Sequence, residues 1–152
     1  AIIASIASGF VALAVAQEAA TKPRKVVKSD AEWRKQLTRE QYLVTRQADT
    51  EPAGSGKLLH NKAKGIYESV CCGTALFSSK TKFESGTGWP SFTDPANLEH
   101  VELRPDNSHF MRRTEVICKA CDAHLGHVFD DGPGESGQRY CINGCALTFE
   151  EK

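Results

Sequence analysis

The sequence has no excess of charge of either sign: its 152 residues include 19 basic and 19 acidic side chains, and the formal net charge is zero. A protein that is drawn to nucleic acid or to an anionic membrane by its overall electrostatic field carries a basic excess. This balance argues against both kinds of partner. We therefore expect no nucleic-acid partner, and we expect the chain to act as a monomer.

The sequence also lacks a hydrophobic run long enough to span a membrane, which takes about 20 apolar residues. Its one uncharged stretch covers residues 1–16 (AIIASIASGFVALAVA) and is followed by polar and basic residues. The small residues at 14–16 match the pattern that precedes signal cleavage. We expect residues 1–27 to be a targeting or signal-like segment, with a buried core helix as the alternative, and residues 28–152 to form one domain.

A chain of this length needs no dense disulfide framework, so its six cysteines require another explanation. Cys118 and Cys121 have the two-residue gap of a zinc-binding turn, and Cys72 ends a second turn of this kind. In that second turn Ser69 stands where the outer cysteine would be. We expect Cys72, Cys118 and Cys121 to bind zinc, with Cys71 or water as a fourth ligand. The alternative is a set of buried, reduced cysteines that pack as small hydrophobic residues.

The N-terminal part of the domain carries two helix-start patterns. Ser29 or Asp30 is suited to cap a short helix that ends at Leu37. Thr38, with Gln41 three residues later, has the capping-box spacing of a second helical turn. These patterns predict a small helical layer at the start of the domain.

Glycine and proline divide the rest of the chain into short segments, after a predicted loop over residues 51–64. Seven segments have the length and composition of strands: 66–70, 76–78, 100–103, 111–117, 127–129, 139–142 and 146–149. Their turns recur about every ten residues, as in an antiparallel sheet or sandwich. The sequence therefore predicts a mainly β fold.

The segment around Cys141 predicts a reactive thiol. In a strand, the period of two places Arg139, Cys141 and Asn143 on one face. Tyr140 and Ile142 then face the core. A guanidinium and an amide beside a thiol are expected to lower its pKa and make it a nucleophile. The alternative is an inert core cysteine beside a surface arginine.

Two histidines, His124 and His127, follow the second cysteine turn. On a regular strand they would face opposite ways, but Gly126 allows a bulge or turn that brings both imidazoles to one side. Imidazoles can transfer protons near neutral pH, so such a pair beside a thiolate suits acid catalysis on an oxygen leaving group. Zinc ligation and a plain surface position are the competing roles.

Aromatic residues are presented by a glycine-rich loop before residue 93. Glycines on both sides of Thr87 permit sharp turns, and Pro90 makes the end of the loop rigid. Trp89 and Phe92 are therefore expected to line a small apolar pocket and bind substrate. An aromatic lid over the core is the alternative.

Three long motifs bring these residues together: CGTALFSSKTKFESGTGWPSF, RRTEVICKACDAHLGHVFDDGP and GQRYCINGCALTF. In this order and spacing they resemble the B-type methionine sulfoxide reductases, and the resemblance extends from about residue 28 to residue 149. It implies a fold of two antiparallel β-sheets. It also implies reduction of the R epimer of methionine sulfoxide, free or in protein, by a peptide-methionine (R)-S-oxide reductase that uses a thiol or disulfide as electron donor.

The resemblance assigns a role to each matching residue. Cys141 corresponds to the nucleophile, which would attack the sulfoxide sulfur and remain as a sulfenic acid. His124 and His127 correspond to the histidines at the substrate oxygen, one of them the proton donor. Arg139 and Asn143 correspond to residues that orient and polarise the site, while the tryptophan of the GWPSF motif corresponds to the wall against which the substrate methyl packs.

The sequence departs from the family pattern at the recycling step. Thr87 stands where many members carry a resolving cysteine, so we expect recycling by thioredoxin, glutaredoxin or a small thiol. Cys145 lies about 13 Å from Cys141 if the strand stays extended, which is beyond disulfide reach. Cys71 is the better internal candidate.

The sequence also fits two other functional classes. One rival is a zinc-ribbon-like module that displays Trp89 and Phe92 to a protein partner. Another is an inactive relative that binds methionine sulfoxide without turnover, suggested by Ser69 and Thr87. The apolar segment and the basic residues 22–25 fit import into a plastid or the secretory route. The domain is most similar to plastid-type members of the family, which have threonine in the resolving position, and this resemblance implies a plastid.

Overall fold

The computed structural model describes residues 25–152, so most of the expected targeting segment lies outside the described residues. Its last part does contact the domain. The backbone N–H of Val26 donates to the carbonyl of Ala120 at 2.5 Å, and Lys25 forms an ion pair with Asp122. The contacts of the domain therefore begin before the expected boundary at residue 28.

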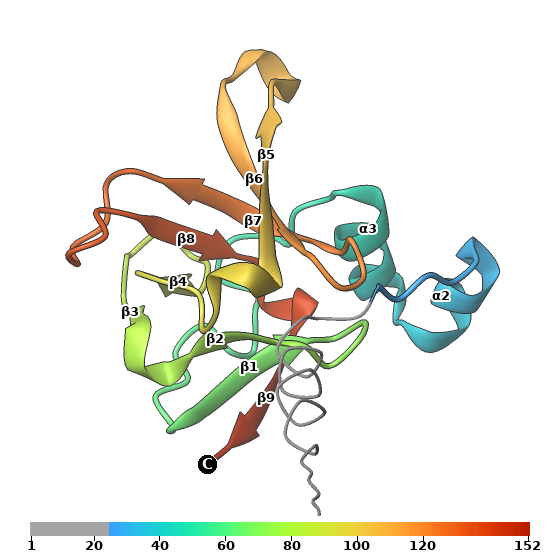
Figure 1. Cartoon of the computed structure of the whole chain (residues 1–152), viewed down its shortest axis with the longest axis horizontal. Coiled ribbons are helices and arrows are strands. Elements are labelled where there is room, and N and C mark those ends of the chain that lie inside the picture. Colours follow the sequence, from blue (N-terminus) through green and yellow to red (C-terminus); the bar gives the residue numbers. More distant parts are fainter. Residues whose placement is uncertain (1–24) are drawn as a thin grey trace, which may run out of the picture.

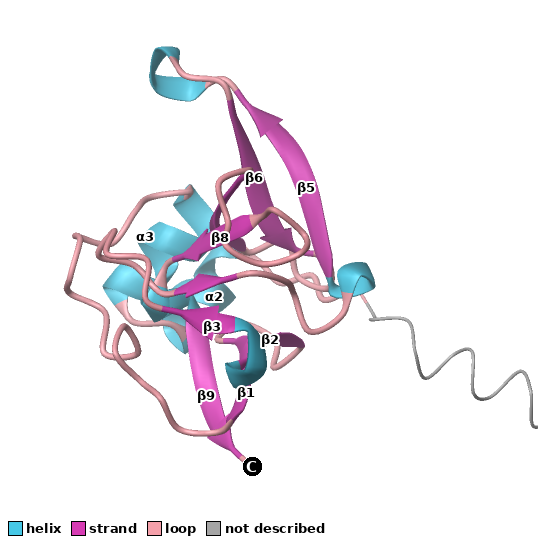
Figure 2. Cartoon of the chain, turned by 90° about the vertical axis from the view of Figure 1, so that its left-hand side faces the viewer, coloured by secondary structure: helices cyan, strands magenta, loops and turns pink. Residues whose placement is uncertain are grey.

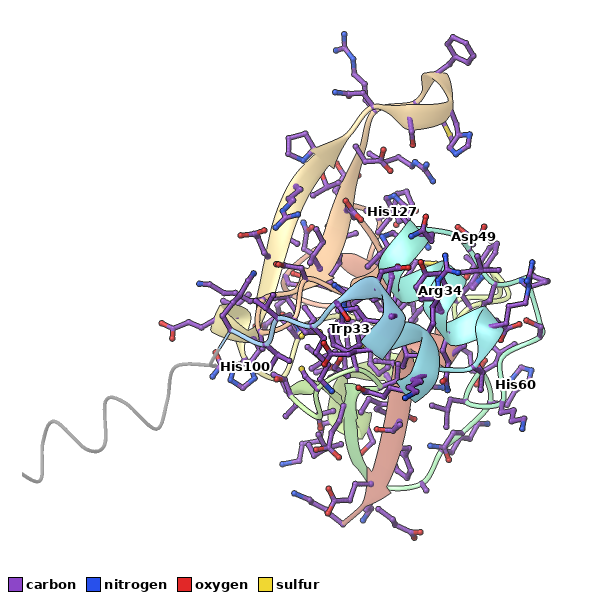
Figure 3. The ribbon with its side chains drawn as sticks, turned by 90° about the vertical axis from the view of Figure 1, so that its right-hand side faces the viewer. Trp33, Arg34, Asp49, His60, His100 and His127 are labelled. Carbon is purple, nitrogen blue, oxygen red and sulfur yellow. The ribbon has the colours of Figure 1, made fainter. Side chains whose placement is uncertain are left out.

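The described residues contain two α-helices, α2 (Asp30–Gln36) and α3 (Arg39–Gln47). Ser29, one of the two predicted caps, begins α2, and Thr38 pairs with Gln41 in the predicted capping box at the start of α3. The helices are held together by Trp33 of α2, which is labelled in Figure 3 and is buried. The guanidinium of Arg46 of α3 lies over its ring at 4.4 Å. Within residues 25–152, no helix is both long and apolar enough to cross a membrane.

The rest of the domain is two antiparallel β-sheets (Figure 1). The three-stranded sheet has the order β2 (Ala75–Ser78), β1 (Gly65–Ser69), β9 (Leu147–Glu151). The six-stranded sheet has the order β3 (Lys82–Phe83), β4 (Ser91–Phe92), β8 (Arg139–Ile142), β7 (His124–Phe129), β6 (Arg113–Cys118), β5 (Val101–Asp106). The predicted fold class is confirmed. All seven expected strands are present, that over residues 139–142 with the expected bounds, while the two-residue strands β3 and β4 were not expected.

The two sheets meet at a cluster of aromatic side chains. Phe77 of the smaller sheet stacks on Phe92 of the larger one, with ring centroids 4.5 Å apart. Tyr67 meets Phe92 edge-on at 5.2 Å, and Tyr140 packs against Phe77. This cluster fixes one face of β4 and β8 against the core, so the alternate residues of these strands face away from it.

Strands β5 and β6 form an arm that stands away from the body of the domain (Figure 2). The strands pair along their full length, from Val101 opposite Cys118 to Asp106 opposite Arg113. The arm therefore has one end beside the cysteine turns and carries Asp106 and Arg113 toward its outer end.

Candidate active site

The candidate site lies on the face of the six-stranded sheet that looks away from the aromatic core. Cys141 on β8 is directly opposite His127 on β7 and opposite Ser91 on β4. His127 is in turn opposite Glu115 on β6. Residues that are directly opposite in neighbouring strands share a face, with Cβ atoms about 5 Å apart. The sheet therefore places a thiol, an imidazole and a carboxylate in one row.

A bulge in β7 brings the second histidine to the same face. The pairing of β6 with β7 shifts at Leu125, and the rings of His124 and His127 lie 5.5 Å apart, as the sequence predicted. Gly126 has a separate role, because a Cβ at this position would lie 2.0 Å from the carbonyl oxygen of Cys141. No side chain fits where β8 passes this close to β7.

Each histidine is held by a carboxylate from another strand. A ring nitrogen of His124 (Nδ1) lies 2.5 Å from Glu115, and Nε2 of His127 lies 2.7 Å from Asp106. Burial lowers the pKa of His127, although Asp106 acts in the opposite direction. The pKa of Asp106 itself is lowered by hydrogen bonds from Ser108 and His127. The sequence had not indicated either carboxylate.

The pKa of the Cys141 thiol is raised, so the expectation of a lowered value is wrong for this site without substrate. Burial disfavours the thiolate and outweighs Arg139 and the hydroxyl of Thr87, both of which lower the pKa. Arg139 is held in place beside the thiol: it pairs with Asp131 at 2.8 Å and lies 4.5 Å over the ring of Phe129. The guanidinium therefore lowers the pKa of Cys141 by less than burial raises it.

A cavity of about 110 Å³ opens above Cys141 and gathers several of the predicted residues. Four expected residues line it: Cys141, His127, Trp89 and Asn143. Four others were not expected there: Thr50, Arg113, Gly126 and Phe129. His124 and Arg139 are not part of this lining and contact it through His127 and Phe129. The cavity is therefore a small pocket with the thiol in its wall.

Phe92 does not line this pocket, which corrects the expectation that it binds substrate. Its side chain is 0% exposed and belongs to the aromatic core. The reason is the period of two in β4: Ser91 faces Cys141, so Phe92 faces the opposite side. Trp89, in contrast, is at the pocket, and its indole N–H donates to the backbone carbonyl of Glu51 at 3.0 Å.

Asn143 borders the pocket, but its amide groups are used to hold the backbone. Its Oδ1 accepts from the N–H of Glu51, and its Nδ2 donates to the carbonyl of Leu125, both at 2.9 Å. The side chain is 3% exposed. Asn143 thus links β8, β7 and the loop after α3, and orients the site through these bonds.

The loop before β4 has the expected conformation. Gly86 and Gly88, on either side of Thr87, have φ values of 76° and 97°, which favour glycine. The hydroxyl of Ser85 connects this loop to β4, since it lies 2.8 Å from that of Thr87 and 2.7 Å from that of Ser91. The loop is therefore fixed beside the strand that faces Cys141.

The two cysteine turns have the same backbone geometry. In one, the N–H of Gly73 donates to the carbonyl of Ser69 at 2.8 Å; in the other, the N–H of Asp122 donates to that of Cys118, also at 2.8 Å. Gly73 and Asp122 both have a positive φ. Ser69 therefore occupies the position in its turn that Cys118 occupies in the other.

The thiols of Cys72, Cys118 and Cys121 meet between these turns, all within 4.8 Å of one another. Tetrahedral zinc with Zn–S bonds of about 2.3 Å requires sulfur atoms roughly 3.8 Å apart. The sulfurs of Cys72 and Cys118 are 3.7 Å apart, and the hydroxyl of Ser69 is 3.6 Å from the sulfur of Cys121. This donor set fits a metal ion. Cys71 is not part of the group of three, and its side chain is buried.

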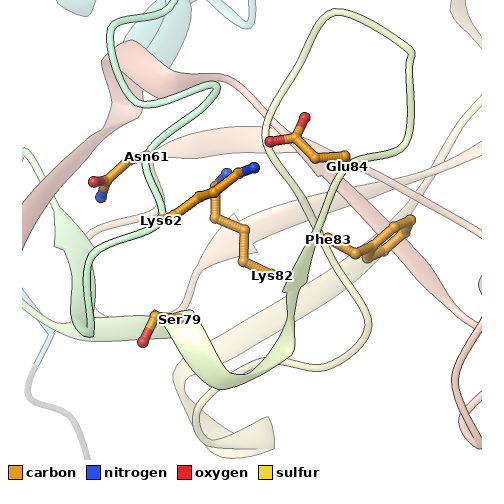
Figure 4. Close-up of a pocket in the computed structure, with 6 residues that line it drawn as sticks. All are labelled: Asn61, Lys62, Ser79, Lys82, Phe83 and Glu84. Carbon is orange, nitrogen blue, oxygen red and sulfur yellow. The ribbon is translucent and has the colours of Figure 1, made fainter.

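A separate cavity of about 330 Å³ lies at the edge of the larger sheet (Figure 4). Its lining consists of Asn61, Lys62, Ser79, Lys82, Phe83 and Glu84. None of these side chains lines the cavity at Cys141.

Comparison with known proteins identifies the family. The SelR domain profile matches residues 37–151. This chain belongs to the SelR domain family.

Relatives of the SelR domain confirm the match over most of the chain. The peptide methionine sulfoxide reductase MsrB of Methanosarcina mazei is 56% identical over 128 residues, which are 84% of this chain and 91% of the relative. That of Leptospira interrogans is 52% identical over 84% of this chain and 98% of its own length. The rice peptide methionine sulfoxide reductase B1, chloroplastic, is 55% identical over 81% of this chain and 58% of its own length.

One cysteine of this SelR domain lies apart from both groups of candidate residues. Cys145 follows β8 in the 3-10 turn η4 (Gly144–Ala146), so the distance expected for an extended strand does not apply. Its cavity is separate from that of Cys141. Burial and the carboxylates of Glu51 and Glu40 raise the pKa of the Cys145 thiol. This environment disfavours a reactive thiolate.

Proposed function

We propose that this chain reduces the R epimer of methionine sulfoxide, in proteins or free, to methionine. The observation that carries the proposal is the direct pairing of Cys141 with His127 across β8 and β7, in a pocket that Trp89 also lines. Relatives up to 56% identical are named peptide methionine sulfoxide reductases. A nucleophilic sulfur beside a proton carrier is the arrangement that this reaction needs.

In the proposed reaction, the thiolate of Cys141 attacks the sulfoxide sulfur. The substrate oxygen takes a proton and is transferred to Cys141, which becomes a sulfenic acid, and methionine leaves. The methionine sulfur is reduced by two electrons and the cysteine sulfur is oxidised by two. Apart from protons, the oxygen is thus the only atom that is transferred in this step.

The shifted pKa values indicate how the proton moves. Near neutral pH the raised pKa of Cys141 and the lowered pKa of His127 favour a neutral thiol and a neutral imidazole. Transfer of one proton from the thiol to His127 creates the nucleophile and the acid together, without changing the total charge of the pair. Asp106, bonded to His127, stabilises the imidazolium that forms.

Two buried nitrogens can bind the sulfoxide oxygen. Among the residues that the structure describes, three buried side-chain nitrogens have no hydrogen-bond partner, and two of them are at the site: Nε2 of His124 and Nε of Arg113. His124 lies beside His127, and Arg113 lines the pocket. With the oxygen on this polar side, the substrate methyl group faces Trp89. Opposite walls of this kind distinguish the two epimers.

Recycling is proposed to use an external thiol. A first thiol attacks the sulfenic sulfur of Cys141, forms a mixed disulfide and releases water; a second thiol restores Cys141 and leaves as a disulfide. Thr87 occupies the position where many members of the family carry a resolving cysteine. Its hydroxyl lowers the pKa of Cys141. Cys71 is buried in the turn that also carries Cys72 and does not line the pocket of Cys141, which supports thioredoxin, glutaredoxin or a small thiol as the reductant.

Cys72, Cys118 and Cys121 are proposed to hold a structural zinc ion, with Ser69 at the fourth corner. When bound, zinc supplies a cross-link between folded segments. Here the thiols come from the turn after β1 and from the turn between β6 and β7, which belong to different sheets. The site would therefore fasten the smaller sheet to the larger one.

We also propose that residues 1–27 direct the chain to a plastid. The support is the composition of this segment and a chloroplastic relative from rice. Import by isolated chloroplasts, with and without residues 1–27, tests this. Entry into microsomes in place of chloroplasts would favour the secretory route.

The proposed activity is tested by incubating the purified protein with each epimer of peptidyl methionine sulfoxide and excess dithiothreitol. We expect the R epimer to be reduced and the S epimer to remain. A zinc-dependent binding module or an inactive sulfoxide-binding relative would reduce neither. Equal reduction of both epimers would contradict the pocket geometry described above.

A further inference from the structure

Glu51 lies in the loop after α3, far from the catalytic motifs in sequence, yet it is 2% exposed and joins three parts of the site. Its backbone N–H donates to Asn143, and its carbonyl accepts from the indole of Trp89. Its carboxylate accepts from the backbone N–H of Gly144 at 2.7 Å and from that of Cys145 at 3.0 Å. All of its main-chain and side-chain polar groups are therefore used at the site.

The carboxylate caps the turn that follows the nucleophile strand. The first N–H groups of a helical turn need acceptors, which the side chain of the N-cap residue usually supplies. In η4 the N-cap is Asn143, and its side chain makes no capping bond because it is bound to Glu51 and Leu125. Glu51 supplies the missing acceptor, so the path of the chain after Cys141 depends on a residue from another loop.

The surroundings leave room for this carboxylate. A Cβ on Gly56 would lie 2.8 Å from the Glu51 side-chain oxygen, so the glycine keeps that space open. The negative charge also acts on the nucleophile, because Glu51 raises the pKa of Cys141. A buried carboxylate that makes thiolate formation harder is more readily explained by its hydrogen bonds than by its charge.

We propose that Glu51 is a positioning residue for the reduction: its carboxylate fixes the turn after Cys141 and thereby the amide of Asn143 and the wall formed by Trp89. The kinetic part of this inference rests on the proposed function. The effect of the Glu51 charge on the pKa of Cys141 does not depend on that function.

The test compares Glu51→Gln and Glu51→Asp with the wild type. Glutamine has nearly the same shape but turns an NH₂ group toward one of the two backbone N–H donors; aspartate keeps the charge but is too short to reach both. We expect kcat/KM for the R epimer to fall about 10- to 100-fold in both variants, mainly through kcat, because small misplacements of reacting groups cost this much.

Site-resolved alkylation of Cys141 as a function of pH provides a second readout. Glu51→Gln removes the nearby negative charge, so we expect the midpoint to move to lower pH; Glu51→Asp should keep the wild-type midpoint. Glu40→Gln is the matched control, because Glu40 is an exposed carboxylate in the same cluster with Glu51 and Cys145. It should leave kcat/KM and the Cys141 midpoint unchanged.

Three results decide the question. If the folded Glu51→Gln protein keeps wild-type kcat/KM, the proposal is overturned whatever its midpoint, because the midpoint reports the charge of Glu51 and not the position of the turn. Should this variant not fold, as judged by circular dichroism, Glu51→Asp decides: wild-type kcat/KM overturns the proposal, and a lowered value at an unchanged midpoint supports it. If the wild type reduces no sulfoxide, the proposed function fails, while the alkylation midpoints still decide whether Glu51 acts on the thiol.

Discussion

The two cysteine sites of this domain, the pocket of Cys141 and the cluster of three thiols, are assembled in different ways. Cys141 is a single thiol whose partners come from neighbouring strands, and it lines a small pocket. Cys72, Cys118 and Cys121 are three thiols brought together by two turns with the same backbone hydrogen bonds. The pocket places different chemical groups around one sulfur, whereas the turns repeat one group around a common centre.

This difference determines which of the two sites can be recognised from a short stretch of sequence. A turn with a two-residue gap fixes its own geometry, so its ligands can be recognised from their spacing alone. A row across a sheet depends on strand register, which a distant part of the chain determines. Residues from different strands can thus bring groups with different pKa values into one pocket. Two similar turns can supply several thiols for one metal ion.

The largest effect is expected from removing the single thiol. Cys141→Ser should abolish reduction of the R epimer with dithiothreitol, because a hydroxyl does not form the sulfenic acid intermediate. The melting temperature should stay close to that of the wild type, since the side chain keeps its shape. Turnover assays with circular dichroism check both points. Residual turnover in this variant would place the nucleophile elsewhere.

A substitution in the cysteine turns should have the opposite effect: the melting temperature should fall more than the turnover rate. Cys118→Ser removes a proposed zinc thiolate, so we expect loss of bound zinc and a fall in Tm of about 5 °C or more, given ~2–4 °C per kcal/mol in a domain of this size. Metal analysis and thermal melting measure these effects. An unchanged zinc content would exclude Cys118 as a ligand.

Ser69→Cys is the complementary variant for the same site. Ser69 occupies the position equivalent to Cys118 in the matching turn, so a thiol there should complete four sulfur ligands. We expect slower zinc loss to a chelator than in the wild type. Faster loss would show that position 69 does not point to the metal.

The pH dependence of kcat/KM should reflect the titration of groups in the pocket and not of the thiols in the turns. Below the pKa of His127 both groups are protonated and no thiolate forms; above the pKa of Cys141 the imidazole is neutral and no acid is left. We expect a plateau of kcat/KM between these limits. Asp106 raises the pKa of His127, so Asp106→Asn should move the acid limb to lower pH. An acid limb that does not move would mean that another group provides the proton.

The smallest effect is expected at the cysteine that belongs to neither group. Cys145→Ser should leave dithiothreitol-dependent turnover unchanged, because Cys145 lines a different cavity from Cys141 and its pKa is raised. Loss of turnover in a folded Cys145→Ser protein would contradict recycling by an external thiol.

Much of the fold follows from patterns that are local in the chain. The capping boxes at Ser29 and Thr38 define both helix starts, and alternation over residues 139–142 defines β8. Phe92 shows the limit of such reasoning. The strand β4 has two residues, too few to show which of them faces the core, and only the pairing of Ser91 with Cys141 decides it.

The partners of the histidines could not be predicted for a related reason. Asp106 and Glu115 lie on β5 and β6, and their relation to His127 depends on the register of three strands. Glu51 comes from a loop, where no periodicity marks a buried residue. The sequence predicts the wrong direction for the pKa of Cys141 because it shows the charged neighbour, Arg139, but not the depth of burial of the thiol.

The close approach of β8 at Gly126 has a consequence for protein engineering. Because even a methyl group at this position would meet the carbonyl of Cys141, the floor of the pocket cannot be reshaped by substitution there. The strands cannot be moved apart without displacing the nucleophile. Variants made to accept a bulkier sulfoxide should therefore be sought in the loops, at Thr50 and Trp89, which line the same pocket.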